Sequence, residues 1–528
     1  MKKYKIISLF LLSISIFTSC IDDLETEPKD VTKTIDQLLE EQSTLGGLVS
    51  KVYGSFALSG PSGPGSTDTP GDDAGESPFL RGIINLQDFT ADDMKNRWGD
   101  NGLDQLTTTS DWDENNKFFR YMYNRIYYTV PQANNVIKQV SVLDFATKDQ
   151  VISEMRFLRA LSYYYLIDCF GKGPILTEND LPNVSKPEST RQQLFSFIES
   201  ELKDIEEKLP AYIGYGRANK SVARMLLAKL YLNAEVYTGS PRYADALIYS
   251  KKIIDEGGYS LTPNFVSLFS GDNNLTSAKN EIIYALIADP LTSQSYGNTT
   301  YLVNGSLNGS NMQLGDYGAT EGWGGHRATK AWYGLFGNSA QDLDDSDDDR
   351  AHLFWSNHLD TDPLKRHNFE MEDYKEWTDG FPSVKFRNSN FSSSTVATSF
   401  SGTDFPLFRL ADVYLMYAEC VVRGGGGSIS QALQYVNDVR NRSNATTINA
   451  SQLTLDFILD ERARELNFEG HRRSDLIRFG KFTGGTYLWP WKGNVKDGTA
   501  IPVHYNLFPI PLKAIQANPN LTQNIGYN

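Results

Sequence analysis

The chain has 528 residues, of which 40% are hydrophobic and 22% charged, a composition that fits a globular protein with a large buried core. Its formal net charge of −15 argues against nucleic acid and against sulfated or uronic-acid-rich polymers as ligands, because a polyanion binds to a basic surface. A neutral ligand is the simplest fit.

The N-terminus has the pattern of an export signal. Three lysines precede an apolar run from Ile6 to Phe17, which is shorter than the roughly 20 residues that span a bilayer. The run ends in "FTSC", which resembles a bacterial lipobox, where the cysteine is acylated and becomes the first mature residue. We therefore expect a signal peptide over residues 1–19 and a lipidated tether over 20–35, anchored through Cys20. An ordinary signal peptide is the alternative.

The rest of the chain, residues 36–528, is predicted to be a single, mainly α-helical domain. Its first helix is predicted over 34–57, and a loop rich in Gly, Pro, Ser and Asp follows over 59–77. Apolar residues at helical spacing predict the next helices over 114–140, 149–169 and 190–208.

Two similar helix–break–helix units occur later, over 221–257 and 411–442. In both, an Ala-Glu pair precedes a small-residue break, and an Ala-Leu-x-Tyr motif follows it. Paired helices with alanine at close-packing positions indicate tetratricopeptide-like hairpins that stack into a superhelical scaffold. The region between the units, about 258–405, is predicted to be an irregular insertion with short strands. Insertions of this size are usually functional.

Signatures of catalysis and metal binding are absent from the sequence. It contains no GxSxG elbow, P-loop, HExxH or CxxC pair, and its six histidines lack metal-ligand spacing. The acidic run at 342–350 lacks the glycine and glutamate of an EF-hand and is predicted to be a solvated turn. The charged cluster within 459–480 has the i, i+3, i+4 spacing of structural ion pairs. Cys169 and Cys420 are predicted to be buried free thiols.

Three aromatic residues stand outside any apolar period. Trp98, Tyr296 and Trp323 lie in "NRWGDNG", "QSYGNTTY" and "TEGWGGHR", among turn residues. A core aromatic residue normally belongs to an amphipathic pattern, so these three are predicted to be exposed. An exposed ring can pack on the C–H face of a sugar while polar neighbours bind its hydroxyl groups.

Four segments together resemble the SusD/RagB family of Bacteroidetes surface lipoproteins. They are "SEMRFLRALSYYYLIDCFGKGP", "FPLFRLADVYLMYAE", "ERARELNFEGHRRSDLIRFG" and "YNLFPIPLKAIQANPNLTQNIGY". The resemblance implies tetratricopeptide-like hairpins with a loop-rich, glycan-binding face. It also implies a lipid-anchored protein at the outer-membrane surface that acts as the lid of a TonB-dependent, SusC-type transporter.

The loops resemble most closely those of the family's starch-binding members. The matching segments are "DDAGESPFLR", "RWGDNGLDQLT", "YGNTTYLVNG" and "GWGGHR". The resemblance implies that Trp98, Tyr296 and Trp323 form an aromatic arc for starch or malto-oligosaccharide, with Arg81 and Asn101 bound to sugar hydroxyl groups. It also suggests a structural calcium ion, for which the nearest residues here are Asp272, Asn274 and Asp379.

The expected function is therefore non-catalytic capture of an α-glucan for a SusC-like transporter, with no cofactor required beyond a possible structural Ca²⁺. One alternative is a SusD-like binder of another neutral glycan or of a peptide. The other is a surface glycosidase, because glycosidase carboxylates come together only in the fold.

Overall fold

The computed structural model describes residues 42–181 and 184–527, so the predicted signal peptide, tether and Cys20 lie outside the described residues. The described chain contains 17 α-helices and four short strands. Up to the insertion the helices are α3 (Gln42–Ala57), α4 (Phe79–Gln87), α5 (Leu103–Thr107), α6 (Lys117–Ser141), α7 (Lys148–Cys169), α8 (Arg191–Glu206), α9 (Lys220–Leu232), α10 (Ala234–Thr238) and α11 (Tyr243–Glu256). The later helices are α12 (Thr299–Ser306), α13 (Lys330–Tyr333), α14 (Ala340–Asp344), α15 (Leu410–Val422), α16 (Ile429–Arg442), α17 (Leu455–Leu466), α18 (Arg472–Arg478) and α19 (Leu512–Ala517). The strands are β1 (Met94–Asn96), β2 (Ile282–Leu286), β3 (His326–Ala328) and β4 (Phe405–Arg409).

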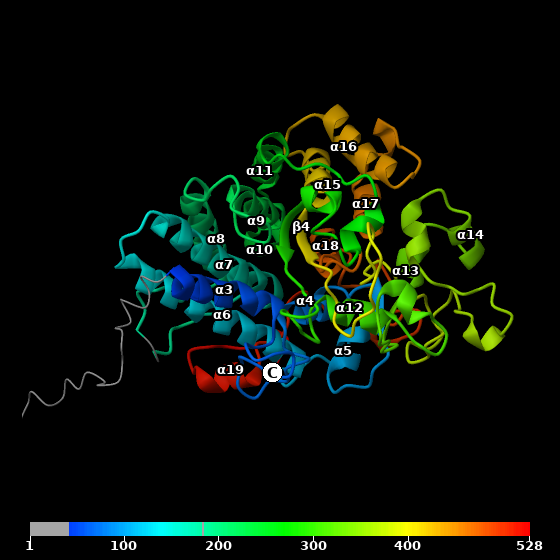
Figure 1. The fold of residues 1–528 in the computed structure, drawn as a ribbon, viewed down its shortest axis with the longest axis horizontal. Helices are drawn as coiled ribbons and strands as arrows, with labels where there is room; N and C mark the ends of the chain where they lie inside the picture. Colours follow the sequence, from blue (N-terminus) through cyan, green and yellow to red (C-terminus); the bar gives the residue numbers. More distant parts are fainter. Residues whose placement is uncertain (1–41, 182–183, 528) are drawn as a thin grey trace, which may run out of the picture. The chain divides into compact units, whose positions relative to one another are not determined.

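The helices stack in chain order, as the repeat-like units predict. Helix α6 packs on α7, α7 on α8, α8 on α9, and α9 on α11. Helix α11 then packs on α15, which contacts α16 and α17 (Figure 1). The stack therefore continues directly from α11 to α15, and the long segment between these two helices is inserted into it. The prediction of a mainly α-helical hairpin scaffold is confirmed. All the contacts described below lie within one compact unit, Leu48–Asn528.

Local sequence explains where these helices begin and how closely they approach. The Asn116 side chain accepts a hydrogen bond from the Phe118 N–H at the start of α6, and Thr190 forms a capping box at the start of α8. The alanines of the two similar units, Ala234, Ala246, Ala418 and Ala432, are fully buried. Their small side chains let neighbouring helices pack closely.

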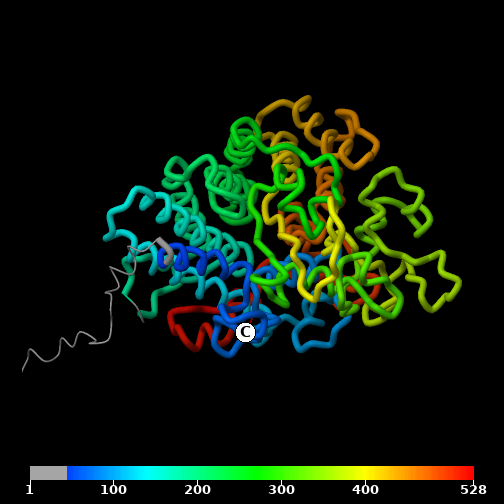
Figure 2. The backbone as a smooth tube through the Cα atoms, in the orientation of Figure 1, coloured from blue at the N-terminus to red at the C-terminus, as the bar shows by residue number. Residues whose placement is uncertain are grey.

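The segment between α11 and α15 is irregular, as predicted. It holds the short helices α12, α13 and α14 and the strands β2 and β3, joined by long loops (Figure 2). Strand β2 pairs antiparallel with β4, so both ends of the insertion are held at the helical stack. Strand β3 pairs antiparallel with β1, whose Asn96 lies 230 residues before its partner His326. This pairing was not predicted.

The charged cluster of 459–480 is a buried ion-pair network, which supports the structural interpretation. The Arg409 guanidinium lies 2.6 Å from Glu465, 2.7 Å from Glu469 and 3.1 Å from Glu281. Arg350 pairs with Glu461 at 2.9 Å and with Glu465 at 3.0 Å. These carboxylates are fully buried, so they brace α17 against β4 and the insertion rather than facing a ligand. Cys169 and Cys420 are buried free thiols, as predicted.

Burial shifts the pKa values of two sets of groups in opposite directions. It lowers the pKa of three neutral histidines, to about 3 for His326, about 4 for His367 and about 3 for His471. Burial also raises the pKa of three carboxyl groups: well above the usual range for Asp88, to about 7 for Asp93 and to about 7 for Asp404.

The stability of the protein should therefore be nearly level between pH 6.5 and about 4.5 and fall steeply below about pH 4. As the pH falls from 6.5, each buried histidine removes about 1.4 kcal/mol of stability per pH unit, because only its unfolded form takes up a proton. Each of the three raised carboxyl groups adds a similar amount, because its folded form takes up a proton first. Below pH 4 the network is lost, since arginine neighbours hold the pKa values of carboxylates such as Glu461 and Glu469 below their usual range. Urea denaturation midpoints from pH 8 to 3 check this, and a fall in stability that begins at pH 6 would contradict it.

Candidate functional site

The three aromatic residues singled out in the sequence lie in one row. The Trp98 and Trp323 ring centroids are 6.3 Å apart, and those of Trp323 and Tyr296 are 6.4 Å apart. Trp98 follows strand β1 and Trp323 precedes β3, so the antiparallel pairing of Asn96 with His326 brings the two indoles together. Tyr296 lies just before helix α12 in the same insertion. We call these three residues the aromatic row.

The rings of the aromatic row are inclined to one another and partly open to solvent. Successive ring planes are turned by 53° between Trp98 and Trp323 and by 47° between Trp323 and Tyr296. Tyr296 is 42% exposed, and both tryptophans are half-buried. All three rings are thus accessible in part, and the Trp98 ring also packs 5.9 Å from that of Tyr301 in the core.

The tryptophans are held by backbone contacts that explain the second of the paired glycines in "GWGGHR". The Trp98 Nε1–H donates to the Trp323 carbonyl at 3.2 Å, and the Trp323 N–H donates to the Asn304 carbonyl at 2.6 Å. The Trp98 indole lies against the backbone of Gly325, where an added Cβ would stand 2.5 Å from the ring Cζ2. Glycine is therefore required at this position by close approach.

We expect Gly325→Ala to weaken ligand binding about tenfold or more, because the new methyl group must push Trp98 out of the row. The matched control is Gly315→Ala, since a Cβ at Gly315 meets nothing within 4 Å. Binding isotherms of both variants check the prediction. Equal affinities would mean that the position of Trp98 does not matter.

The loop at 59–77 forms one border of the row. The Asp72 carboxylate pairs with Arg120 on α6, and Glu76 pairs with Lys117 on the same helix at 2.7 Å. These ion pairs fix the loop although its sequence is rich in turn residues. Gly75 within it lies against Tyr296, with 3.6 Å from an added Cβ to the tyrosine Cβ. The four loops expected to bind a ligand thus meet at one place.

Arg81 and Asn101 have different surroundings. Arg81 is only 7% exposed, and its guanidinium lies 4.4 Å from the Tyr301 ring centroid and donates to the Gly75 carbonyl at 3.0 Å. Arg81 thus supports the row from beneath, and a contact from it to a sugar hydroxyl group stays a prediction. Asn101 is exposed, and its side chain makes no hydrogen bond to other described residues.

A fourth aromatic ring lies at this site and was not predicted from the sequence. Phe400 is half-buried, and its centroid lies 5.1 Å from that of Tyr296, so the aromatic surface continues beyond the row. It lies in "TVATSFSG", where a lone aromatic residue sits among small polar ones. The criterion that identified Tyr296 applies equally to this segment.

Two of the three residues proposed for calcium, Asp272 and Asp379, accept hydrogen bonds from nearby protein groups. The Asp272 carboxylate accepts hydrogen bonds from the Phe391 N–H at 2.7 Å and from the Ser392 N–H at 2.9 Å. The Asp379 carboxylate accepts from the Asn368 amide at 2.7 Å and the Asp373 N–H at 2.6 Å. These donors tie loops together, whereas calcium needs six to eight oxygen ligands. No cluster of three or more His, Cys, Asp or Glu suited to a metal was found among the described residues, and the calcium ion stays a prediction.

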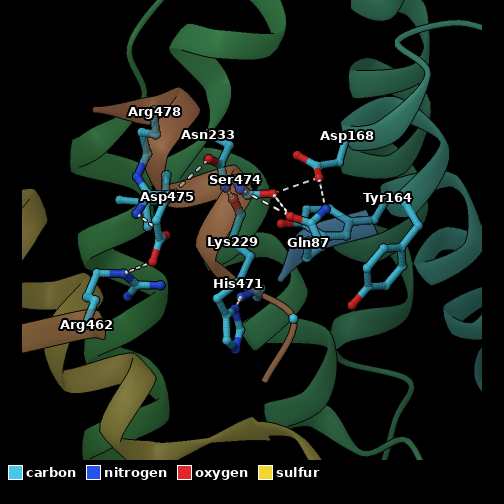
Figure 3. Close-up of a pocket in the computed structure, with 13 residues that line it drawn as sticks. Gln87, Tyr164, Asp168, Lys229, Asn233, Arg462, His471, Ser474, Asp475 and Arg478 are labelled. Atoms are coloured by element: carbon cyan, nitrogen blue, oxygen red, sulfur yellow. Dashed lines mark hydrogen bonds and ion pairs between the residues drawn. The ribbon is translucent and has the colours of Figure 1, made fainter. Parts of the chain in front are cut away.

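A small polar cavity lies inside the helical body, away from the aromatic row and between α4, α7, α9 and α18 (Figure 3). The Ser474 hydroxyl there donates to Asp168 at 2.7 Å, and the His471 ring lies 3.1 Å from the Lys229 ammonium. The free volume is about 20 Å³, which is room for one water molecule. A sugar ring does not fit, so these serine, histidine and acidic side chains form a structural polar centre.

Comparison with known proteins places the chain in a family. A sequence profile described as "SusD family" matches residues 280–527, and one described as "Starch-binding associating with outer membrane" matches 81–232. The chain is 34% identical to "Starch-binding protein SusD" of Bacteroides thetaiotaomicron, over 97% of this chain and 96% of the relative. The chain belongs to the SusD family.

Other SusD-like proteins extend the comparison. "SusD-like protein P25" of Formosa agariphila is 25% identical, with 81% of each chain covered. A solved SusD superfamily protein from Parabacteroides distasonis has a TM-score of 0.70 at 20% identity, over 92% of this chain and 99% of that one. The structure titled "Surface glycan-binding protein A" from Bacteroides thetaiotaomicron, in complex with laminarihexaose, has a TM-score of 0.68 at 20% identity, with the same coverage. These two structures confirm the SusD fold. No helix in the described ranges is long and apolar enough to cross a bilayer.

Proposed function

We propose that this SusD-family protein captures starch or malto-oligosaccharides at the aromatic row. The observation that carries the proposal is the row of three adjacent, partly exposed rings, in a chain 34% identical to a protein named for binding starch. Aromatic ring faces pack on the C–H groups of sugars, and neighbouring rings here are inclined by 53° and 47°. Inclined rings do not form one flat platform, so they suit the natural bend of an α-1,4-glucan better than they suit a flat, extended glucan.

The ligand is neutral, and capture is non-catalytic. The formal charge of −15 disfavours an anionic polymer, and the relatives are named as binding proteins. Binding should therefore depend only weakly on salt, since no ion pair to the ligand needs to be screened. Another neutral glycan is the main alternative, because a similar fold has been solved in complex with laminarihexaose.

Native electrophoresis in gels that contain amylopectin, laminarin or hydroxyethylcellulose tests the ligand. We expect retardation by amylopectin alone, and retardation by another glycan without amylopectin would overturn the assignment. Incubation with maltoheptaose tests the absence of catalysis, because a glycosidase would release shorter products.

The captured glucan would pass to a TonB-dependent, SusC-type transporter at the outer-membrane surface, with Cys20 as the lipid anchor. The sequence profile described as "Starch-binding associating with outer membrane" and the motif "FTSC" support this location. We expect Cys20→Ala to release the protein from membranes, because acyl chains on this cysteine are the predicted anchor. Membrane fractionation after a salt wash checks it, and full retention of the variant would contradict the lipobox.

A further inference from the structure

Strands β1 and β3 are joined beneath the aromatic row by a side-chain contact as well as by their backbones. Asn96 and His326 face each other in the antiparallel register, and both are fully buried. The Asn96 Nδ2 lies 2.9 Å from the His326 Nδ1. Trp98 is two residues beyond Asn96 and Trp323 three residues before His326, so this contact ties together the two chain segments that carry the tryptophans.

The hydrogen-bond partners fix where each proton lies. The His326 Nε2 is 3.0 Å from the Tyr301 carbonyl oxygen on α12, so this nitrogen carries the proton and donates. The His326 Nδ1 is then an acceptor for the Asn96 amide N–H. The other end of the Asn96 amide, Oδ1, accepts from the Trp98 N–H at 2.7 Å. Each hydrogen bond is therefore donated in the same direction, from the Trp98 N–H to Asn96, from Asn96 to His326, and from His326 to the Tyr301 carbonyl on α12.

The surroundings of His326 keep its ring neutral and immobile. The rings of Phe89, Tyr301 and Trp98 lie 4.9, 4.6 and 5.1 Å from it. The α12 backbone packs against its edge at Gly305, where an added Cβ would overlap the imidazole. The charged groups that act on the ring are Arg81 from α4 and Arg327 on β3, both of which oppose a second positive charge.

We propose that Asn96 and the neutral tautomer of His326 form a positioning pair, which sets the register of Trp98 against Trp323 and thereby the affinity of the aromatic row for its glycan. The pair does not contact the ligand, and this role rests on the proposed function of the row. This positioning role predicts that replacing the Asn96 side-chain N–H donor by an acceptor makes glycan binding depend on pH.

The variant Asn96→Asp provides the test in the full-length chain. Its carboxylate still accepts from the Trp98 N–H, but its second oxygen faces the lone pair of the His326 Nδ1. At low pH a proton shared between the two groups restores the hydrogen bond, and at high pH two acceptors repel each other. We expect the affinity of Asn96→Asp for maltoheptaose to fall about tenfold or more between pH 5.5 and 8.5, the scale of one buried hydrogen bond turned into a repulsion. The native chain should give a flat profile, because its His326 stays neutral throughout this range.

Three controls make the result decisive. Asn115→Asp adds the same charge on an exposed turn and should leave the profile flat. His326→Phe keeps an aromatic ring at this position but removes the acceptor for Asn96 together with the donor toward Tyr301, so it should weaken binding equally at every pH. Near-ultraviolet circular dichroism of the tryptophan pair, without sugar, should change with pH in Asn96→Asp alone.

A flat affinity profile and an unchanged dichroism spectrum in Asn96→Asp would overturn the positioning role. If that variant does not fold, native affinity in His326→Phe would overturn it instead. If the native chain binds no glycan, the proposed function fails, while the dichroism measurement still decides whether the pair sets the register of the tryptophans.

Discussion

Trp323→Ala should lower the affinity for maltoheptaose by a factor of about 30 or more, which corresponds to about 2 kcal/mol, the cost of truncating a central aromatic anchor. Trp323 stands in the middle of the row, between Trp98 and Tyr296, so its loss removes the surface that both neighbours continue. Its indole N–H donates to the exposed Glu321, and the ring lies on the surface side of the loop. The melting temperature should therefore change little. Isothermal titration and thermal melting on the same samples give both quantities.

The remaining row residues supply graded comparisons. Tyr296→Ala should resemble Trp323→Ala, and the double variant should abolish retardation in starch gels. Trp98→Ala should lose both affinity and stability, because this ring packs on Tyr301 and His326. Asn101→Ala should cost only about 1 kcal/mol of binding, as expected for an accessible hydrogen bond.

An aromatic residue away from the row serves as the control. Tyr212 is 75% exposed, and Tyr212→Ala should leave starch binding unchanged. Unchanged starch binding in Trp323→Ala with a markedly lower melting temperature would mean that the row is packing and not a binding surface.

Arg409→Met should give the largest loss of stability, about 3–5 kcal/mol in the free energy of unfolding, because it leaves buried carboxylates without their cation. Arg409 pairs with Glu281, Glu465 and Glu469, and all four side chains are at most 1% exposed. Methionine keeps much of the volume, so the loss measures charge rather than a cavity. Urea denaturation at pH 7 checks it.

Two comparisons isolate the buried charge. Lys251→Ala breaks an exposed, solvent-screened ion pair with Asp255 and should leave the urea midpoint unchanged. The difference in unfolding free energy between the native chain and Arg409→Met should also become smaller as the pH falls from 7 to 5. Without the cation the pKa values of the folded carboxyl groups rise above their unfolded values, so protonation favours the folded variant. An Arg409→Met variant as stable as the native chain would contradict the role assigned to the network.

The helical scaffold could be predicted from the sequence because its signals are local. Apolar spacing and capping residues determine α6 to α9, and the repeated Ala-Leu-x-Tyr motif marks α11 and α16. The aromatic row could be predicted in part, since Trp98, Tyr296 and Trp323 stand among turn residues. The pairing of β1 with β3, the burial of Arg81 and the place of Phe400 could not, because each depends on a partner far away in the chain.

The contact between Trp98 and Trp323 joins residues 225 positions apart in the sequence. The chain must close a long loop before that contact forms, and non-local contacts of this kind slow folding. Helix pairs such as α6 with α7 need only their near neighbours and can form earlier. Folding would therefore have two stages, in which the stack of helical hairpins assembles first and the aromatic row last. The indole pair reports the second stage, and a protein caught between the two would be helical but would lack an assembled aromatic row.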